Sequence, residues 1–489
     1  MTFGWCTITA VIRDEDSDRA DLLARDLQRD CHALGIMARV EDINAAEAVE
    51  GTWPGNGTSN IRRPLMTGTN FADLVLPADH WPGLPYVNSP FYPERTPAPM
   101  VCGGAGSKAP FYLPTHINGV ANQLIVGPTG GGKSSLLGAM ACAYLAIPKA
   151  RIAWLDLDYS SFVLAHLLGD HADYRDMGAQ DTPPLCPLAL LDQPDGLEWL
   201  FGWFERLFTR WNNFELDERQ SEEFAFCLRE ARRTGVRSIS GLRSLIPGEQ
   251  TRIRRILRHY STYWKQIFDG DAANAPTRPV TVYELRGLVG LGKRASAPAT
   301  ELILHSIISS LDGSPAWIFA DEFWSLLGDD VSAEWLFDSI RTVRKKNCGF
   351  IGCTQSLTEI VNSPYCGLLL ESCPGRIYLP NQEARGDYVC DAYHRLGLND
   401  HEISIISGAS PQRDYYYRSP IGSRLFTLAL GDVAKNICAA TGYNHVQLAR
   451  RILDDSPNGH FLDAWLSERL PNRQYHLSIA TEAEAASRR

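Results

Sequence analysis

Residues 127–134 read GPTGGGKS and lie between two stretches of opposite character. Residues 122–126 are typical of a short buried strand, and residues 134–146 place apolar side chains at helical spacing. Two glycines five positions apart, followed by a lysine and a hydroxyl residue, fit the Walker A pattern. The segment therefore predicts a strand, a phosphate-binding loop and a helix, in that order.

The residue types of this loop match the chemistry of a triphosphate. Glycines let the backbone turn tightly and approach a ligand, and the N-terminal end of the following helix favours negative charge. We expect Lys133 to lie in an accessible loop and to reach the β- and γ-phosphates, and the Ser134 hydroxyl to bind Mg²⁺. The predicted nucleotide-binding residues are Gly127, Pro128, Thr129, Gly130, Gly131, Gly132, Lys133, Ser134 and Ser135.

Three other strand ends carry polar side chains suited to the same site. The apolar run 316–320 ends in Asp321 and Glu322, which fits a Walker B motif with Asp321 as Mg²⁺ ligand and Glu322 polarising the attacking water. Gln355 follows the strand 349–353 and is the candidate sensor of the γ-phosphate, with a structural turn as the alternative. Asp156 and Asp158 end the strand 151–157, where they either touch the water shell of the metal or hold a turn.

The rest of the chain predicts an α/β fold in three segments. Strands and helices alternate from about residue 111, which indicates a mainly parallel sheet covered on both faces. We expect a remnant of an N-terminal α/β domain at 1–50, an irregular linker at 51–108 and the nucleotide-binding domain at 109–489. The remnant should hold strands at 3–13 and 36–41 and helices at 17–34 and 45–50.

Residues 192–274 interrupt this alternation and read as a helical insertion. Its aromatic stripe, which includes Trp203, Phe204 and Phe208, is predicted to be core. Nine arginines fall between Arg229 and Arg258, and they form either a solvated helix face or a contact with a substrate or subunit.

Composition limits the remaining functions. The net charge of −10 argues against a nucleic-acid-binding field over the whole chain. The twelve cysteines are scattered without Cys-x-x-Cys spacing, which suits free thiols better than disulfides or a zinc site. No apolar run is long enough to span a bilayer, so we expect membrane contact to come through a partner.

Several separate segments carry a family resemblance. They are DEFW at 321–324 with leucines at 326–327, RKKN at 344–347, TQS at 354–356, and LPN at 379–381 with EA at 383–384. Together they resemble the ATPase family of type IV secretion systems. Residues 60–65, CPL at 186–188 and LALG at 428–431 are similar to its TrbE conjugal transfer branch. The likeness runs from about residue 35 to 440, and the family usually has serine or alanine where Gly131 stands.

The resemblance implies a RecA-like P-loop NTPase that hydrolyses ATP with Mg²⁺ and energises pilus biogenesis and the transfer of DNA–protein substrates. It implies a hexamer or trimer of dimers in the cytoplasm, peripheral to the inner membrane. The implied partners are inner-membrane components of the secretion system, a second secretion ATPase and the coupling protein. Most of the family's N-terminal domain is expected to lie outside this chain.

Rings of RecA-like subunits often complete the site with an arginine from the neighbour. The candidates are Arg344 first, then Arg376 and Arg341, each near a strand end. Two other functions stay open at this point. One is a DNA-translocating motor of the coupling-protein or FtsK/HerA type, and the other is an assembly scaffold that binds nucleotide with little turnover.

Overall fold

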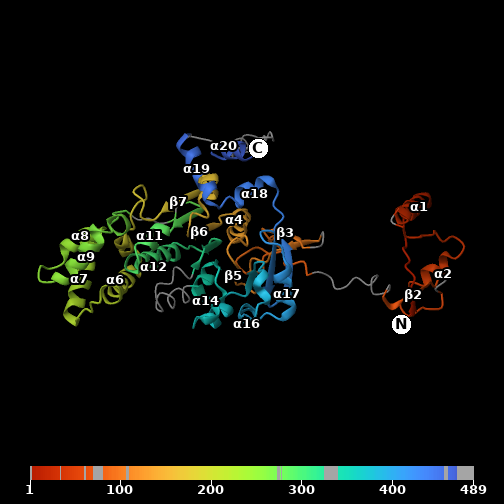
Figure 1. Ribbon diagram of the computed structural model, residues 1–489, viewed down its shortest axis with the longest axis horizontal. Coiled ribbons are helices and arrows are strands. Elements are labelled where there is room, and N and C mark those ends of the chain that lie inside the picture. Colours follow the sequence, from red (N-terminus) through yellow and green to blue (C-terminus); the bar gives the residue numbers. More distant parts are fainter. Residues whose placement is uncertain are drawn as a thin grey trace. The chain divides into compact units, whose positions relative to one another are not determined.

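The computed structural model describes residues 3–33, 35–59, 62–69, 81–105, 109–272, 276, 278–323, 340–455 and 461–470. The chain divides into two compact units, residues 1–80 and 81–489, which are described separately (Figure 1). Of the segments that carry the family resemblance, residues 60–61, 324 and 326–327 lie outside the described residues.

The first unit is smaller and less regular than the sequence predicts. It holds β1 (Phe3–Trp5), α1 (Ser17–Ala33), α2 (Ala45–Glu50) and β2 (Leu65–Thr67), with β1 and β2 antiparallel. The two helices agree with the expected ranges. The expected strands do not, because only Phe3–Trp5 finds a pairing partner and residues 36–41 find none within the described residues. Neither helix buries a residue, so this unit has little core of its own.

The expected linker at 51–108 is corrected by the structure. Leu65–Thr67 pairs with β1, and Val101–Gly104 is a strand of the main sheet. The second unit therefore begins at Trp81 rather than at residue 109. The isolated Gly and Pro residues of this stretch masked short extended segments whose partners lie far away in sequence.

The second unit is built on one sheet of eleven strands, which confirms the predicted α/β class. In spatial order the strands are β4 (Pro110–Tyr112), β3 (Val101–Gly104), β13 (Gly422–Thr427), β12 (Asp414–Ser419), β11 (Gly375–Tyr378), β5 (Gln123–Val126), β10 (Cys348–Thr354), β9 (Ala316–Ala320), β6 (Arg151–Asp156), β8 (Val280–Glu284) and β7 (Ala172–Asp176).

The sheet has a parallel part and an antiparallel part. The seven strands from β11 to β7 run parallel, and β12, β13, β3 and β4 extend the sheet antiparallel beyond β11. Strand β5 lies between β10 and β11, with Val126 opposite Thr354 and Tyr378. The loop that follows β5 therefore opens at the carboxyl edge of the parallel strands, where ligands bind in open α/β sheets.

Helices cover both faces of this sheet. They are α4 (Lys133–Tyr144), α5 (Phe162–Leu167), α6 (Gly196–Asn212), α7 (Glu218–Thr234), α8 (Ile239–Leu245), α9 (Thr251–Thr262), α10 (Lys265–Phe268), α11 (Arg286–Gly290), α12 (Lys293–Ser309), α14 (Leu357–Asn362), α15 (Cys366–Ser372), α16 (Asp387–Arg395), α17 (Asp400–Gly408), α18 (Asp432–Cys438), α19 (Tyr443–Asp455) and α20 (Phe461–Arg469). Short 3₁₀ turns are η1 (Gly169–His171), η2 (Pro187–Asp192), η4 (Arg344–Lys346) and η5 (Gln382–Arg385).

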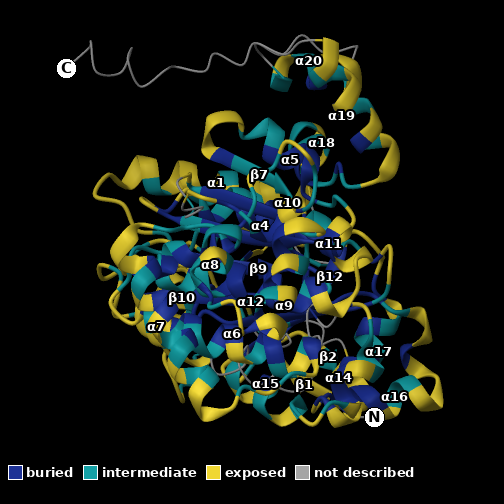
Figure 2. Cartoon of the chain, turned by 90° about the vertical axis from the view of Figure 1, so that its left-hand side faces the viewer, coloured by how far each residue is buried: buried dark blue, intermediate teal, exposed yellow. Residues whose placement is uncertain are grey.

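The alternation of side chains along β5 divides the core into two layers. Leu124 and Val126 join the cluster that includes the aromatic residues of α6, and Ile125 joins the cluster under α4. All four residues of β5 are buried, as expected of a parallel strand covered on both faces. Figure 2 shows buried residues gathered along the strands, with exposed residues on the outward sides of the helices.

The helical insertion forms as predicted and appears in Figure 1 as the group of helices α6 to α9. Trp203, Phe204 and Phe208 have no exposed surface, so the aromatic stripe is core. Arg229, Arg232, Arg255 and Arg258 are exposed. Others are used locally, since Arg233 pairs with Glu230 and Arg237 with Asp192.

Candidate active site

The glycines of residues 127–134 are required by the shape of the loop. Gly130 and Gly132 have φ angles of 77° and 103°, a region that residues with a Cβ rarely adopt. A Cβ on Gly132 would also lie 2.5 Å from the Tyr415 hydroxyl, and one on Gly127 would lie 2.4 Å from Cβ of Leu379. The loop therefore turns tightly while packed against the neighbouring strand ends.

Lys133 is the first residue of α4 and is buried, which corrects the expectation of an accessible lysine. Its ammonium group donates to the carbonyl of Gly127 at 3.0 Å and lies 3.6 Å from Oε1 of Glu322. The lysine thus bridges the start of its own loop and the end of β9. Ser134 follows it in the first turn of α4 and is partly buried.

Asp321 and Glu322 come directly after β9 and face this lysine from the adjoining part of the sheet edge. Asp321 is 5% exposed, and its Oδ2 accepts from the Ser160 hydroxyl at 3.1 Å. Its Oδ1 is buried without a hydrogen-bond partner among the described residues. Burial, then the charges of Asp156 and Glu322, raises the pKa of Asp321 to about 7. A buried, unpartnered carboxylate oxygen beside a hydroxyl-bearing helix start fits a divalent cation, so Asp321 and Ser134 would hold Mg²⁺.

Glu322 is held in an unusual backbone conformation. Its φ of 48° lies in the left-handed region, which costs a non-glycine residue about 1–3 kcal/mol and is common at functional sites. The Oε2 atom accepts from the backbone N–H of Gln355 at 3.2 Å, and Oε1 faces Lys133. The side chain is thereby aimed at the loop rather than along the strand.

Gln355 connects the end of β10 to the loop. The Thr129 hydroxyl donates to Oε1 of Gln355, while the Gln355 backbone donates to Glu322. The structure thus brings Lys133, Asp321, Glu322 and Gln355 to one edge of the sheet, as the sequence predicts.

Asp156 takes part in the site only through a serine. It is fully buried and accepts from the backbone N–H and hydroxyl of Ser161 and from the Ser160 hydroxyl at 2.5 Å. Ser160 also contacts Asp321, so it links the two carboxylates. Asp158 is exposed and pairs with Arg286. Asp156 and Asp158 therefore hold the turn after β6, and Ser160 was not recognisable from sequence because its partners come from different strands.

A second carboxylate, Glu284 at the end of β8, supports the same turn. It accepts from the backbone N–H of Tyr159 at 2.7 Å and from that of Arg286 at 2.8 Å. Burial, followed by the charge of Asp156, raises the pKa of Glu284 to about 8. Asp158 and Tyr159 both have positive φ, so the turn is strained and held by these bonds.

The hairpin β12–β13 covers the loop from the antiparallel side of the sheet. The Gln412 side chain donates to the Gly130 carbonyl at 3.2 Å, and the Tyr415 hydroxyl donates to the Gly132 carbonyl at 3.1 Å. Sequence reasoning found the hairpin but not this contact, because a run of three tyrosines in a strand signals only burial.

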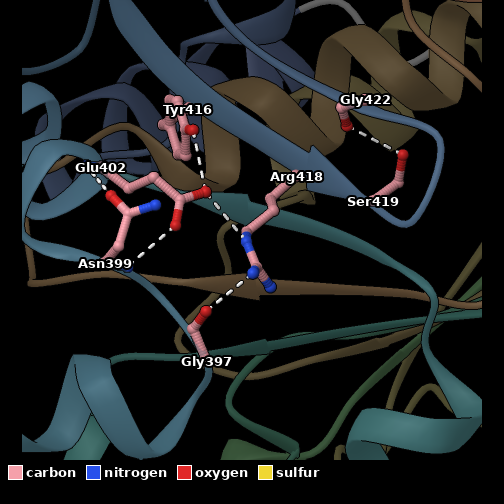
Figure 3. Close-up of polar contacts among 7 residues, drawn as sticks. All are labelled: Gly397, Asn399, Glu402, Tyr416, Arg418, Ser419 and Gly422. Atoms are coloured by element: carbon pink, nitrogen blue, oxygen red, sulfur yellow. Dashed lines mark hydrogen bonds and ion pairs between the residues drawn. The ribbon is translucent and has the colours of Figure 1, made fainter.

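Glu402 of α17 fixes the hairpin in place (Figure 3). Its Oε1 accepts from the Tyr416 hydroxyl at 3.0 Å and from Arg418 at 2.9 Å, and Oε2 accepts from the backbone of Asn399 at 2.9 Å. Arg418 also donates to the Gly397 carbonyl at 2.7 Å. A buried carboxylate with these partners ties the start of α17 to β12, next to the strand residue that contacts the loop.

The three candidate arginines lie away from their own loop. Arg376 begins β11, opposite Leu124 and so near the amino end of the parallel strands, and it donates to the carbonyls of Cys373 and Leu370. Arg341 and Arg344 are exposed and precede β10, whose length separates them from the nucleotide edge by about 20 Å. The structure therefore corrects Arg376, which stabilises the end of α15, and none of the three serves the loop of its own chain.

Comparison with known proteins places the chain in a family. No protein-family model matches it. A probable conjugal transfer protein TrbE of Sinorhizobium fredii is 32% identical over 461 residues, covering 92% of this chain and 68% of the relative. The chain belongs to the TrbE family. The conjugal transfer protein TrbE of Rhizobium radiobacter is also 32% identical, over 481 residues that cover 96% of this chain and 57% of the relative.

The fold is also that of a solved relative of the TrbE family. VirB4 of Thermoanaerobacter pseudethanolicus superposes with a TM-score of 0.57 at 14% identity, over 68% of this chain and 97% of that structure. The chain spans only 57–68% of the length of the two TrbE proteins. Among the described residues, no helix has the length and apolar character needed to cross a membrane.

Proposed function

We propose that this TrbE-family chain hydrolyses ATP as the motor of a conjugative type IV secretion system, energising pilus biogenesis and the transfer of DNA–protein substrates. The proposal rests mainly on one observation, the convergence of Lys133, Asp321, Glu322 and Gln355 at the edge where the glycine loop opens. The names of the TrbE relatives supply the conjugal process.

Each side chain has a distinct task in this proposal. Lys133 exchanges its contacts with Gly127 and Glu322 for the β- and γ-phosphates when ATP binds, which leaves Glu322 free to accept a proton from the attacking water. Mg²⁺, held by Ser134 and Asp321, supplies charge compensation for the phosphates. Gln355 touches both the loop and Glu322, so it is placed to couple the γ-phosphate to the base.

The assembly and its surroundings are part of the same proposal. A hexamer or trimer of dimers would sit on the cytoplasmic side of the inner membrane, with inner-membrane secretion components, a second secretion ATPase and the coupling protein as partners. An arginine from a neighbouring subunit would complete the site, and the exposed Arg344 is the preferred candidate.

Turnover of Mg·ATP by the full chain tests the proposal, with Lys133→Ala as the inactive variant. Lys293→Ala is a matched control, because both lysines begin a helix after a glycine of positive φ but Lys293 is exposed. We expect Lys133→Ala to lose phosphate release and Lys293→Ala to keep it. Nucleotide binding without turnover by the wild-type assembly would instead favour the scaffold function.

A DNA-translocating motor of the coupling-protein or FtsK/HerA type is the second candidate, favoured by the exposed arginines of the helical insertion. Single-stranded DNA should then stimulate turnover several-fold, and the double variant Arg255→Ala/Arg258→Ala should remove the stimulation. Turnover that is indifferent to DNA leaves the secretion motor as the function.

A further inference from the structure

Two cysteines far apart in sequence lie in contact beside the helix that begins at the nucleotide loop. The sulfur atoms of Cys142, in α4, and Cys438, the last residue of α18, are 3.8 Å apart. No disulfide joins any of the chain's twelve cysteines, all of which lie within the described residues. The pair is 296 positions apart, so nothing in the sequence pattern announces it.

The contact is imposed by the packing of α4 against α18. A Cβ on Gly138 would lie 2.6 Å from the carbonyl oxygen of Cys438 and 3.2 Å from its Cα, so the two backbones approach through this glycine. Cys142 stands one helical turn after Gly138 and hence on the same face of α4. The two thiols are therefore held together by a close backbone contact, and a small rotation of the side chains brings the sulfurs to the bonding distance of about 2.05 Å.

The two thiols differ in access and in acidity. Cys142 is partly exposed, whereas Cys438 is only 6% exposed. The contact with the Cys438 thiol lowers the pKa of Cys142, and the same contact together with burial raises the pKa of Cys438. Since the thiolate is the reactive form, Cys142 is the thiol that a small oxidant meets first.

We propose that Cys142 and Cys438 form an intramolecular disulfide when the folded chain reacts with a hydroperoxide. The Cys142 thiolate attacks one peroxide oxygen, the O–O bond breaks, and Cys142 becomes a sulfenic acid while the other oxygen leaves as water or an alcohol. The Cys438 thiol then attacks the Cys142 sulfur, forming the S–S bond and releasing the hydroxyl as water. Two thiols lose two electrons and two protons in total, and the peroxide gains them.

The bond would join α4 to the helices that end the described chain. Cys142 is nine residues after Lys133, about 14 Å along the helix axis, so the modification site is separate from the phosphate loop. The proposal therefore stands independently of the ATPase function. It gives α18, which packs on α4 and α5, a covalent attachment to the core of the second unit.

Peptide mapping of the full chain tests the proposal. The chain is treated with hydrogen peroxide, blocked with N-ethylmaleimide and digested without reductant. We expect a cross-linked pair of peptides containing Cys142 and Cys438, two hydrogens lighter than the separate peptides and released by dithiothreitol. Cys142→Ser and Cys438→Ala should each abolish it, and Cys366→Ala, which removes another partly exposed thiol, should not.

The same treatment in urea separates a folded-state contact from random pairing. We expect the unfolded chain to lose the preference for this pair. Two results would overturn the proposal: both thiols alkylated by N-ethylmaleimide after peroxide treatment, or Cys142 oxidised to the sulfinic acid without a link to Cys438. Wild-type mapping alone gives either result, so the proposal does not depend on how the variants fold.

Discussion

Replacing Asp321 with asparagine is expected to stabilise the chain in the absence of nucleotide and metal, while removing turnover. The carboxyl group is 5% exposed and lies near Asp156 and Glu322, and these surroundings raise its pKa to about 7 from an ordinary value of 3.8. Its ionised form is therefore costly in the folded chain. Asparagine keeps an oxygen for the Ser160 hydroxyl and carries no charge.

The size of the effect follows from this difference in pKa. At 1.36 kcal/mol per pH unit, ionised Asp321 costs the metal-free folded state about 4 kcal/mol above pH 7. The folded state holds a proton that the unfolded state has lost between pH 3.8 and about 7, so stability falls as the pH rises through this window. The buried amide NH₂ group of asparagine costs about 1–3 kcal/mol in return. We therefore expect a net gain of about 1–3 kcal/mol at pH 8.

Urea unfolding of both proteins between pH 5 and pH 8, with a chelator present, measures the effect. The difference in free energy of unfolding between variant and wild type should grow by about 2.5 kcal/mol from pH 5 to pH 8, whatever the cost of the amide. A difference that does not change with pH would refute the reasoning, because it would show that Asp321 keeps the same protonation in the folded and unfolded chains. Mg²⁺ should narrow the gap, since it binds only the wild-type carboxylate.

Three further results follow from the structure. Glu322→Gln should bind ATP and hydrolyse it at least about 10²-fold more slowly, because the amide keeps the shape but not the base; weaker binding with normal turnover per bound nucleotide would contradict this. Gly138→Ala should destabilise the chain by about 1–3 kcal/mol in urea unfolding, whereas Gly202→Ala, where the added Cβ meets only the end of a flexible arginine, should be neutral or stabilising; equal effects would show that the α4–α18 contact yields easily. Arg344→Ala and Lys133→Ala subunits, each inactive alone, should regain part of the activity when mixed; no recovery in mixtures shown to co-assemble would exclude Arg344 as an arginine supplied by a neighbour.

The local parts of the nucleotide site could be read from the sequence because each is a short segment at a strand end. The β5 loop and the carboxylates after β9 follow patterns a few residues long. Parallel strands then bring their carboxyl ends together without further information. The apolar stripe of α6 was equally legible, since its period alone predicts burial.

What could not be read depends on contacts between distant segments. Lys133 is buried by groups from β9 and by its own loop, and Ser160 joins carboxylates of two strands that are not consecutive in the chain. Val101–Gly104 looked like a linker because its partner, β13, comes more than three hundred residues later. Arg376 was misjudged because a strand end can lie at either edge of the sheet, and only topology decides which.

The position of β5 between β10 and β11 has a consequence for synthesis. Both neighbours are encoded more than two hundred residues after β5, and Gln412 and Tyr415, which hold the loop from outside, come later still. A nascent chain that stalls before Tyr415 has the complete GPTGGGKS segment but no walls around it. ATP binding thus becomes available only when the ribosome has almost finished, and an incomplete polypeptide cannot occupy a place in a ring as a subunit loaded with nucleotide.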